Sequence, residues 1–478
     1  MAKKVYISVY DKTDIVDYAC VLQEKFDYEI VSSGGTLEYL CKNGVMAFDI
    51  ADLEAEEKFG KKDFVENFVS QNFDMVIINF CSATQAASET DDVERFADAI
   101  NLFDYSILRA AAKCFKDTIC VTSVDDFYSS INVNYNDRQK LALKAFQYLA
   151  DYDSDIAEKI GEYAGDSKRR QINITKLCQL KYGSNPHQRA SLYTSSKMVD
   201  YKSLGQKDLT YNDILNITTA AYVICEFYDV NAVAVVKNNL PCGVALGRSI
   251  YEAYTKAFDC DPFAAFNGTV AFSQRVNFEI AKHLNSMSAQ VVVAPYFDED
   301  ALALLKSNPE LRIVRIVTDL KNFKNILAEK MTVTPFGTLV ESINKSELDK
   351  DLFKVVTKTK PTTEQLEDAI FAWKIVKFAR TNAVVIAKDF KTVAVIQGQT
   401  GLINATEMAM DVACENSKGA ILATDEFIPS AECINAAAQG RISMIIQPGG
   451  GNKYREVVET ADKYGIAMVV TGIRNLKF

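Results

Sequence analysis

Lys237 and Asn238 stand where an apolar run ends, in VVKNNLPCGVA (235–245). The run predicts a short buried strand, and the two asparagines with Pro-Cys-Gly behind them predict a turn. A lysine at such a point can act as a base only if burial lowers its pKa from about 10.4 towards neutrality. Asparagine can orient an amine or donate to an oxyanion, but it cannot take a proton. The pair is therefore either an active-site motif or an ordinary solvated strand end.

Histidine is scarce, with only His187 and His283 in 478 residues. Histidine is the usual proton carrier near neutral pH, so acid-base chemistry must use one of these two or do without. His283 lies in a helical pattern and is expected to pack or to face solvent. His187 lies in an Asn-Pro-His-Gln turn and is expected to be structural or to lie near a ligand phosphate. No His, Cys and Asp spacing is typical of a metal site, and no metal is expected.

Two loops near the N-terminus have residues suited to bind an anion: SVYDKT (8–13) and SSGGT (32–36). Each follows a predicted strand and leads into a predicted helix, where free N–H groups and the helix dipole favour negative charge. Either loop alone is explained as an ordinary N-cap, but two at one edge of a sheet favour a phosphate site. The candidate ligands are Ser8, Lys12, Thr13, Ser33, Gly34, Gly35 and Thr36.

The elements that position these loops alternate between strand and helix patterns, which predicts a parallel sheet with helices on its faces. We assign this domain to residues 1–125 and a helical connector or dimerisation arm to 126–178. A second, larger α/β region follows at 179–478. Within it NAVAVVK (231–237) and NAVVIAK (382–388) are related strands, each followed by a turn, which indicates two similar halves.

Composition is that of a globular protein, with 48 % hydrophobic and 24 % charged residues. The net charge of −10 argues against non-specific binding to nucleic acid or to an anionic membrane. The N-terminus lacks the apolar run of a signal peptide and no stretch is long enough to span a bilayer, so a cytoplasmic protein is expected. The eleven cysteines form no CxxC motif and are expected to be buried free thiols.

The first domain resembles the N-terminal half of the AICAR transformylase/IMP cyclohydrolase family in SVYDKTDIVDYA, EIVSSGGT and LRAAAK. The resemblance implies a methylglyoxal-synthase-like domain that closes the purine ring to IMP, and it adds Lys113 to the phosphate or nucleotide site. The family's KTLHP loop is missing after DIADLEAEEKF (49–59), and VNLYPF reads INFCSA (78–83). The pattern NIDIGG reads AINLFD (99–104), with Asn101 at the family aspartate. Cyclohydrolase activity is therefore expected to be weak or absent, while phosphate or nucleotide binding remains.

The second region resembles the transformylase half, in order, from QLKYGSNPHQRA (179–190) through AVVKNNLPCGVALG (234–247) to the C-terminus. The resemblance implies a cytidine-deaminase-like fold of two subdomains without zinc, and a homodimer with the active site at its interface. It also implies formyl transfer from 10-formyltetrahydrofolate, as co-substrate, to AICAR. The family's catalytic Lys-His pair reads Lys237-Asn238.

The other positions carried over by the resemblance divide into kept and altered. Asn382 is expected to be catalytic. Lys181 replaces an arginine and loses its fork for phosphate, and Leu402 replaces another arginine. The substrate-binding residues are expected to be Lys181, Tyr182, Asn267, Phe427 and Arg474.

Two functions remain open on these residues. One is an AICAR formyltransferase that runs on Lys237 and is slowed or altered in substrate. The other is a catalytically degenerate protein that binds a purine nucleotide, as a sensor or regulator. The kept lysine favours the first, and the missing histidine favours the second.

Overall fold

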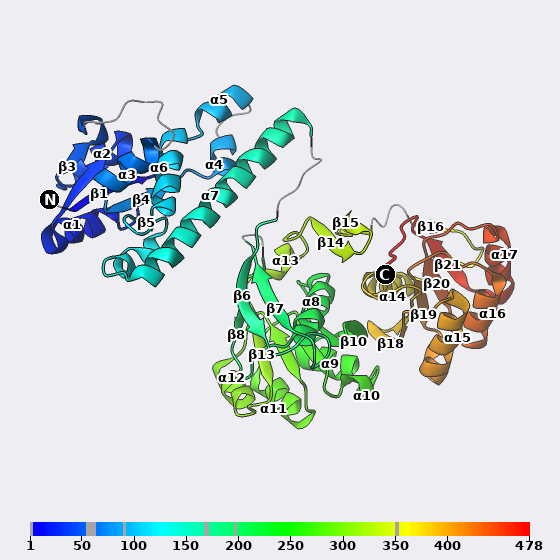
Figure 1. The fold of residues 1–478 in the computed structure, drawn as a ribbon. Helices are drawn as coiled ribbons and strands as arrows, with labels where there is room; N and C mark the ends of the chain where they lie inside the picture. Colours follow the sequence, from blue (N-terminus) through cyan, green and yellow to red (C-terminus); the bar gives the residue numbers. More distant parts are fainter. Residues whose placement is uncertain (1–2, 54–63, 89–91, 167–171, 196–197, 349–352) are drawn as a thin grey trace. The chain divides into compact units, whose positions relative to one another are not determined.

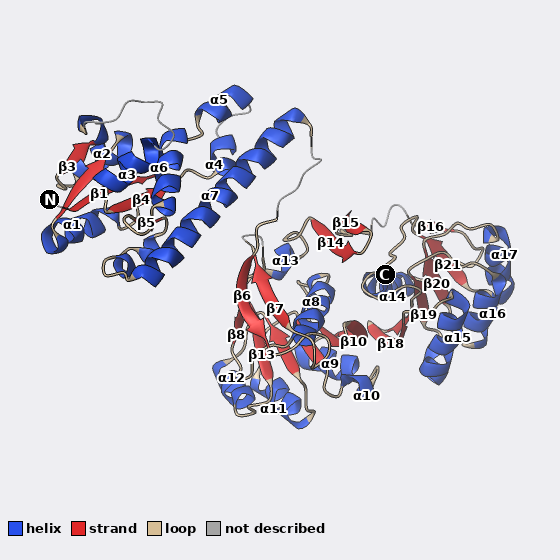
Figure 2. Ribbon diagram, viewed as in Figure 1, coloured by secondary structure: helices blue, strands red, loops and turns tan. Residues whose placement is uncertain are grey.

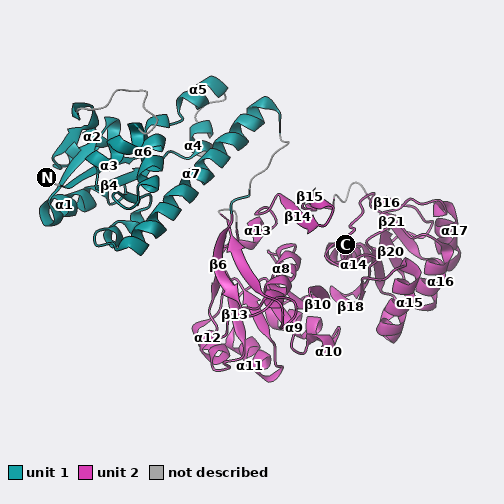
Figure 3. Ribbon diagram, viewed as in Figure 1, with its two compact units in different colours: residues 1–173 teal, residues 174–478 magenta. Residues whose placement is uncertain are grey.

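A computed structural model describes residues 3–53, 64–88, 92–166, 172–195, 198–348 and 353–478. Part of the 49–59 segment, where the KTLHP loop is missing, lies outside these ranges. The chain forms two compact units, 1–173 and 174–478, which Figure 3 colours separately. Within the described ranges, no helix combines the length and apolarity needed to cross a membrane.

Unit 1 contains a five-stranded sheet in the order β3-β2-β1-β4-β5, and every pairing in it is parallel (Figure 1). The predicted parallel sheet is confirmed. Strands β2 and β3 lie on one side of β1, and β4 and β5 lie on the other. The order in which the strands are added to the sheet therefore reverses at β1. The strands are β1 (Lys3–Val9), β2 (Tyr28–Ser32), β3 (Ala47–Asp49), β4 (Met75–Asn79) and β5 (Ile119–Val121).

Helices cover both faces of this sheet and bury two apolar clusters against it (Figure 2). The long helix α7 (Tyr135–Ala164), in the segment expected to be a connector, packs against α6 and β5 of the same unit. The other helices are α1 (Ile15–Phe26), α2 (Gly34–Lys42), α3 (Phe64–Asn72), α4 (Ala83–Ser88), α5 (Val93–Asp98) and α6 (Leu102–Lys113).

Unit 2 is built on one mixed sheet of twelve strands, in the order β16-β21-β20-β19-β17-β18-β10-β9-β11-β12-β13-β8. The order is symmetric about the β18–β10 pair, which confirms the two similar halves. Two further hairpins, β6–β7 and β14–β15, stand apart from this sheet. The first half contains β8 (Tyr201–Ser203), β9 (Ala232–Lys237), β10 (Leu240–Leu246), β11 (Thr269–Phe272), β12 (Val291–Ala294) and β13 (Arg312–Ile316). The second contains β16 (Lys354–Val355), β17 (Val384–Lys388), β18 (Lys391–Ile396), β19 (Ile421–Thr424), β20 (Met444–Gln447) and β21 (Ala467–Val470). The hairpins comprise β6 (Thr175–Leu180), β7 (Ala190–Thr194), β14 (Glu329–Thr334) and β15 (Gly337–Ser342).

The helices of unit 2 repeat in the same symmetric way. One core cluster joins α8 and α14 to the sheet across both halves, and two further clusters lie under the remaining helices of each half. The first half has α8 (Tyr211–Cys225), α9 (Ile250–Phe258), α10 (Pro262–Ala265), α11 (Phe278–Ser286), α12 (Glu299–Lys306) and α13 (Leu320–Phe323). The second has α14 (Thr363–Val376), α15 (Leu402–Ala413), α16 (Ala431–Gln439) and α17 (Tyr454–Tyr464).

The cysteines are all free thiols, as expected, but burial is not general. Cys120, Cys225 and Cys433 are buried, whereas the others are half-buried or exposed. The expectation of buried thiols therefore holds only for those three.

Candidate active site

Lys237 ends β9, and the turn that follows consists of Asn238 and Asn239 alone. Their φ angles of 53° and 65° are left-handed, as a two-residue type I′ hairpin requires, and asparagine adopts this conformation more readily than most residues. The predicted Pro-Cys-Gly turn is wrong. Pro241 and Gly243 lie within β10, at a bulge where the pairing with β9 shifts.

Two hydrogen bonds join the turn to α8, while Asn238 at its tip is exposed to solvent. The backbone N–H of Asn239 donates to Asn216 Oδ1 at 2.6 Å, and Thr219 Oγ1 donates to Asn239 Oδ1 at 2.5 Å. Lys237 is half-buried, and its Nζ donates to the carbonyl oxygen of Phe266 at 2.9 Å. An ammonium has three N–H donors, so this bond leaves two that can donate to an oxyanion. The side chain of the exposed Asn238, by contrast, cannot act as an acid or a base.

Strand directions gather the predicted residues of unit 2 at one edge of the sheet, which we call the site edge. Strand β9 ends there at Lys237, and because β11 is antiparallel to β9, Asn267 precedes the start of β11 at the same edge. Three antiparallel pairings lead from β9 to β17, so Asn382 also lies there. Strands β19 and β21 end at this edge, with Phe427 and Arg474 after them.

Asn267 takes a left-handed φ of 56° and is exposed, with its N–H on the carbonyl oxygen of Ser288. Beneath this part of the site edge lies a buried polar network. Arg312 pairs with Asp213 at 2.8 Å, and Gln290 Nε2 donates to the same carboxylate at 3.2 Å. The Arg312–Asp213 pair was not predicted, because it joins β13 to the start of α8 across the fold. It anchors the helix that holds the Lys237 turn.

Asn382 is half-buried and donates both its N–H and its Nδ2 to the carbonyl oxygen of Gln399, at 3.1 and 3.0 Å. Asp425, fully buried, fixes the residues on both sides: it accepts from Thr381 Oγ1 and, at 2.8 Å, from the N–H of Ala383. Burial raises the pKa of Asp425 despite these bonds. Sequence reasoning matched the segment that holds Asp425 but gave the residue no role.

Phe427 and Arg474 lie together. The Arg474 guanidinium stands 5.0 Å from the centre of the Phe427 ring, and its Nη1 lies 3.7 Å from Glu426 Oε1. Gly451 has a φ of 91°, and a Cβ there would come within 2.7 Å of the Phe427 ring. Residue 451 must therefore be glycine if the Phe427 ring is to keep its position. The exposed guanidinium of Arg474 then lies beside this ring.

Lys181 and Tyr182 follow β6, at the start of the turn that contains His187. Lys181 is exposed and Tyr182 half-buried. Asn212, in the first turn of α8, donates to the carbonyl oxygen of Ser184 at 3.2 Å, which ties this turn to the site edge. His283, by contrast, packs away from it and shares a 2.9 Å hydrogen bond with the hydroxyl of Tyr251.

The site residues of the two halves lie on the same edge without touching. Strands β9 and β17 are three spacings apart in the sheet. At about 4.8 Å per spacing, Lys237 and Asn382 are separated by about 14 Å along the edge. A ligand that contacts both must be long, or the site must be completed by a second copy of the chain.

In unit 1, the predicted anion-binding side chains already have internal partners. Ser8 Oγ donates to Asp104 Oδ2 at 2.8 Å, and Ser33 Oγ lies 3.0 Å from the hydroxyl of Tyr6. Thr36 Oγ1 is shared with the N–H and carbonyl of Val9. The glycines Gly34 and Gly35 are exposed in the first turn of α2.

The remaining predicted residues of unit 1 are dispersed. Thr13 donates to Asp11 Oδ1 at 2.7 Å, and Lys12 Nζ lies 3.4 Å from the carbonyl oxygen of Val9. Lys113 ends α6 and pairs with Glu66 of α3. Asp104 and Lys113 are nine residues apart on this helix, which corresponds to about 13.5 Å, so Lys113 is not brought to Ser8.

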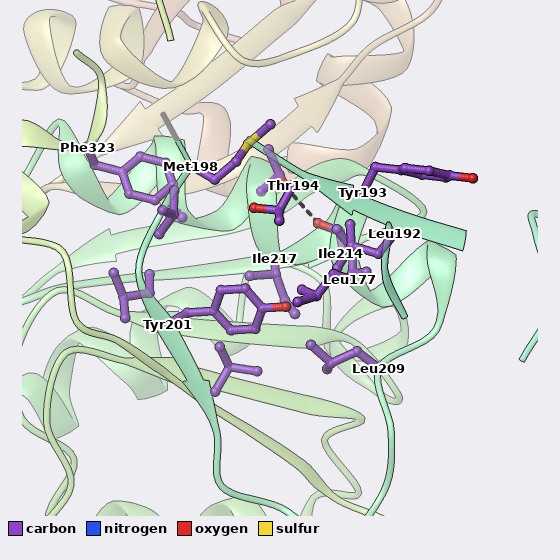
Figure 4. A pocket seen from close by; sticks show the side chains of 15 residues that line it. Leu177, Leu192, Tyr193, Thr194, Met198, Tyr201, Leu209, Ile214, Ile217 and Phe323 are labelled. Atoms are coloured by element: carbon purple, nitrogen blue, oxygen red, sulfur yellow. Dashed lines mark hydrogen bonds between the residues drawn. The ribbon is translucent and has the colours of Figure 1, made fainter. Parts of the chain in front are cut away.

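A cavity of about 190 Å³ lies in the first half of unit 2, between the β6–β7 hairpin, α8 and β13 (Figure 4). Apolar side chains such as Leu177, Ile217 and Phe323 point into it, and it contains none of the predicted site residues. In the part of the chain that is described, no three His, Cys, Asp or Glu side chains are grouped as metal ligands would be.

Known proteins resemble this chain over its whole length. A family model described as the AICARFT/IMPCHase bienzyme matches residues 111–412. The bifunctional purine biosynthesis protein PurH of Clostridium botulinum (strain Hall) is 35 % identical over 516 residues, covering 100 % of both chains. PurH of Caldicellulosiruptor saccharolyticus is 36 % identical over 518 residues, again covering 100 % of both. A chain solved as the crystal structure of ForH is 20 % identical with a TM-score of 0.27, over 34 % of this chain and 99 % of its own, which is too low to carry an argument.

Proposed function

Because the chain belongs to the AICARFT/IMPCHase bienzyme family, we propose that it transfers the formyl group of 10-formyltetrahydrofolate to the 5-amino group of AICAR, giving FAICAR. The observation that supports this most is the gathering of the matched residues of both halves at the site edge, although they come from strands far apart in the sequence. The substrates are small molecules, and neither nucleic acid nor a membrane is required.

The reaction forms a bond between the amine nitrogen and the formyl carbon and breaks the bond from that carbon to N10 of the folate. The amine loses a proton and N10 gains one. Lys237, held by the carbonyl oxygen of Phe266, donates its remaining N–H groups to the oxygen that becomes negative during attack. Asn382 and Asn238 orient the amine and the carboxamide. The pair Phe427 and Arg474 offers a ring face and a cation to the nucleotide.

Turnover is slow because Asn238 cannot carry the proton. Losing one general base typically costs about 10²–10⁴-fold in rate. Leu402 supports the same expectation, since it is buried in the core of the second half and gives no cation to a phosphate. These two observations also favour the second candidate function, a degenerate protein that binds a purine nucleotide without turning it over.

We propose that a homodimer completes the site, with residues of one half facing those of the other half of a second copy. The separation of about 14 Å between Lys237 and Asn382 supports this arrangement. Unit 1 contributes little cyclohydrolase activity, because Asn101 stands at the family aspartate, while its two loops, at Ser8–Thr13 and Ser33–Thr36, keep a site for phosphate. A cytoplasmic location and independence of metal ions complete the proposal.

The test is an assay of purified protein with AICAR and 10-formyltetrahydrofolate, in which tetrahydrofolate and IMP are followed separately. We expect release of tetrahydrofolate without a matching rise in IMP. Lys237→Ala is the active-site control. Tetrahydrofolate release no faster than in that variant contradicts the formyltransferase, and calorimetry with AICAR and IMP then decides whether the nucleotide-binding alternative holds.

A further inference from the structure

Asp104 is a buried carboxylate, 5 % exposed, at the start of α6 in unit 1. Three side chains donate to it: the hydroxyl of Tyr6 at 2.7 Å, Ser8 Oγ at 2.8 Å and Asn101 Nδ2 at 2.6 Å. Asn101 also caps α6, accepting from the N–H of Asp104 at 3.0 Å. Burial, and then the charge of Asp104, raise the pKa of Tyr6, so the phenol stays protonated and donates. Both carboxylate oxygens are thus engaged by neutral donors.

The position of this carboxylate coincides with the predicted phosphate loops. Ser8 belongs to the first loop and bonds Asp104 directly. Ser33 belongs to the second and is joined to Asp104 through the hydroxyl of Tyr6. Two loops that are suited to an anion therefore already surround one, supplied by the chain itself.

We propose that the carboxylate of Asp104 occupies the anion-binding position between the two phosphate loops of unit 1. It thereby lowers the affinity of these loops for anionic ligands. A phosphate monoester gains the hydroxyl of Ser8 only by displacing the carboxylate, and until then it meets a fixed negative charge. The inference rests on the proposal that the two loops form a phosphate site.

The experiment measures binding of inorganic phosphate and of IMP to the full-length chain by calorimetry. Asp104→Asn removes the charge and keeps the shape, and we expect it to raise the affinity for both ligands by roughly tenfold or more. Asp126→Asn is the matched control. Asp126 is also buried in unit 1, 8 % exposed, but it pairs with Lys144 at 2.6 Å and not with Ser8 or Tyr6, so Asp126→Asn makes the same change in net charge without freeing a loop hydroxyl and is expected to leave both affinities unchanged.

A second variant guards against misfolding of the first. Asp104→Gly empties the position entirely, but it leaves the hydroxyls of Tyr6 and Ser8 without their acceptor, so a lower thermal transition than that of the wild type is expected and the affinities are measured well below it. Unchanged phosphate and IMP affinity in a folded Asp104→Asn or Asp104→Gly chain overturns the proposal. Because IMP bound by unit 2 contributes equally to every variant, the difference reports unit 1 alone. Formyl transfer, measured on the same samples, can fail or succeed independently.

Discussion

Lys237 and Lys388 end equivalent strands in the two halves of unit 2, and their surroundings match closely. Lys237 Nζ donates to the carbonyl oxygen of Phe266 at 2.9 Å, and Lys388 Nζ to that of Lys418 at 3.0 Å. Both lysines precede a two-residue turn with left-handed φ angles. In the first turn the N–H of Asn239 donates to Asn216, and in the second both turn residues donate to Asp368.

The likeness extends to Asn382. Its counterpart Asn231 also precedes a central strand, and the Nδ2 of each donates to a carbonyl of the segment after the neighbouring strand, that of Arg248 for Asn231 and that of Gln399 for Asn382. The symmetry places Lys388 and Asn231 at the opposite edge of the sheet. Each edge therefore has a lysine from one half and an asparagine from the other, and these contacts by themselves indicate scaffold rather than chemistry.

The edges differ in what surrounds this shared scaffold. At the opposite edge the halves are joined by a backbone bond, from the N–H of Leu246 to the carbonyl of Phe390 at 2.9 Å. At the site edge the side chain of Gln397 makes the link instead, donating to the carbonyl of Pro241 at 2.8 Å and accepting from the N–H of Arg380 at 3.1 Å. Lys237 is also half-buried where Lys388 is exposed. The duplication supplies the frame, and the site edge departs from it.

The largest effect is expected from restoring a proton carrier. Asn238→His should raise formyl transfer by about 10²-fold or more, because histidine supplies a general base and tolerates the left-handed φ of 53°. Asp389→His makes the equivalent change at the opposite edge and should have no effect on turnover. Steady-state rates with AICAR and 10-formyltetrahydrofolate check both. Equal rates in the two variants would show that the missing histidine is not what limits turnover at the site edge.

Lys237→Ala and Lys388→Ala remove equivalent amines that make equivalent bonds. We expect the first to lower kcat by about 10²-fold, because it removes a donor to the developing oxyanion, and the second to change it by less than about threefold. Both should lower the free energy of unfolding by a similar small amount, about 1 kcal/mol, since each loses one hydrogen bond. Rates and urea denaturation on the same samples separate chemistry from scaffold. Similar kcat losses in both variants would contradict the assignment of chemistry to the site edge.

Local patterns in the sequence were enough to predict the frame but not these differences. Apolar runs such as 231–237 and 382–388 identify buried strands, and their similarity predicts the duplication because it is written in adjacent residues. The hairpin after Lys237 was misread, because Pro-Cys-Gly is a stronger turn signal by composition than Asn-Asn. The turn forms at the two asparagines instead, because a type I′ turn requires left-handed φ angles at both of its central residues.

The roles of some residues depend on strands that are far apart in the sequence, and local patterns could not predict them. Asp425 acts on Thr381 and Ala383, and its contacts exist only because β17 and β19 pair. Asp104 meets Ser8 through the packing of α6 on the parallel sheet. The spacing of Asn101 and Asp104 does fit a helix N-terminus, and that signal alone could have marked the helix start.

A difference in buried charge separates Asp425 from its counterpart Ser273. Ser273 Oγ accepts from the N–H of Ala232 at 2.9 Å, as Asp425 Oδ1 accepts from that of Ala383. Asp425→Ala should cost about 2–4 kcal/mol of unfolding free energy, because it leaves buried donors unpaired, and Ser273→Ala about 1 kcal/mol. Only the Asp425 variant should also lower kcat, by about tenfold. Denaturant unfolding and rates test this, and a larger cost at Ser273 would contradict it.

The link between the halves offers a smaller effect. Gln397→Leu removes the bridge from Pro241 to Arg380 and makes the residue resemble Leu246 of the opposite edge. We expect kcat to fall about threefold to tenfold, since misplacement of reacting groups slows reaction, with little change in KM. Gln397→Glu retains an acceptor for Arg380 and should recover part of the rate. A change confined to stability would leave Gln397 as scaffold.

The smallest effect uses a titration near the C-terminus of the second half. Burial, and then the nearby charge of Lys330, lower the pKa of Lys477 to about 8. Below pH 8 the amine is protonated in both states and the folded state bears the cost of burying its charge. Between about pH 8 and the unfolded pKa near 10.4 the folded chain has lost a proton that the unfolded chain retains, so stability should rise with pH. Urea denaturation from pH 7 to 10 should show this rise in the wild type and in Lys463→Met, an exposed control, but not in Lys477→Met. A rise that persists in Lys477→Met would assign the titration to another group.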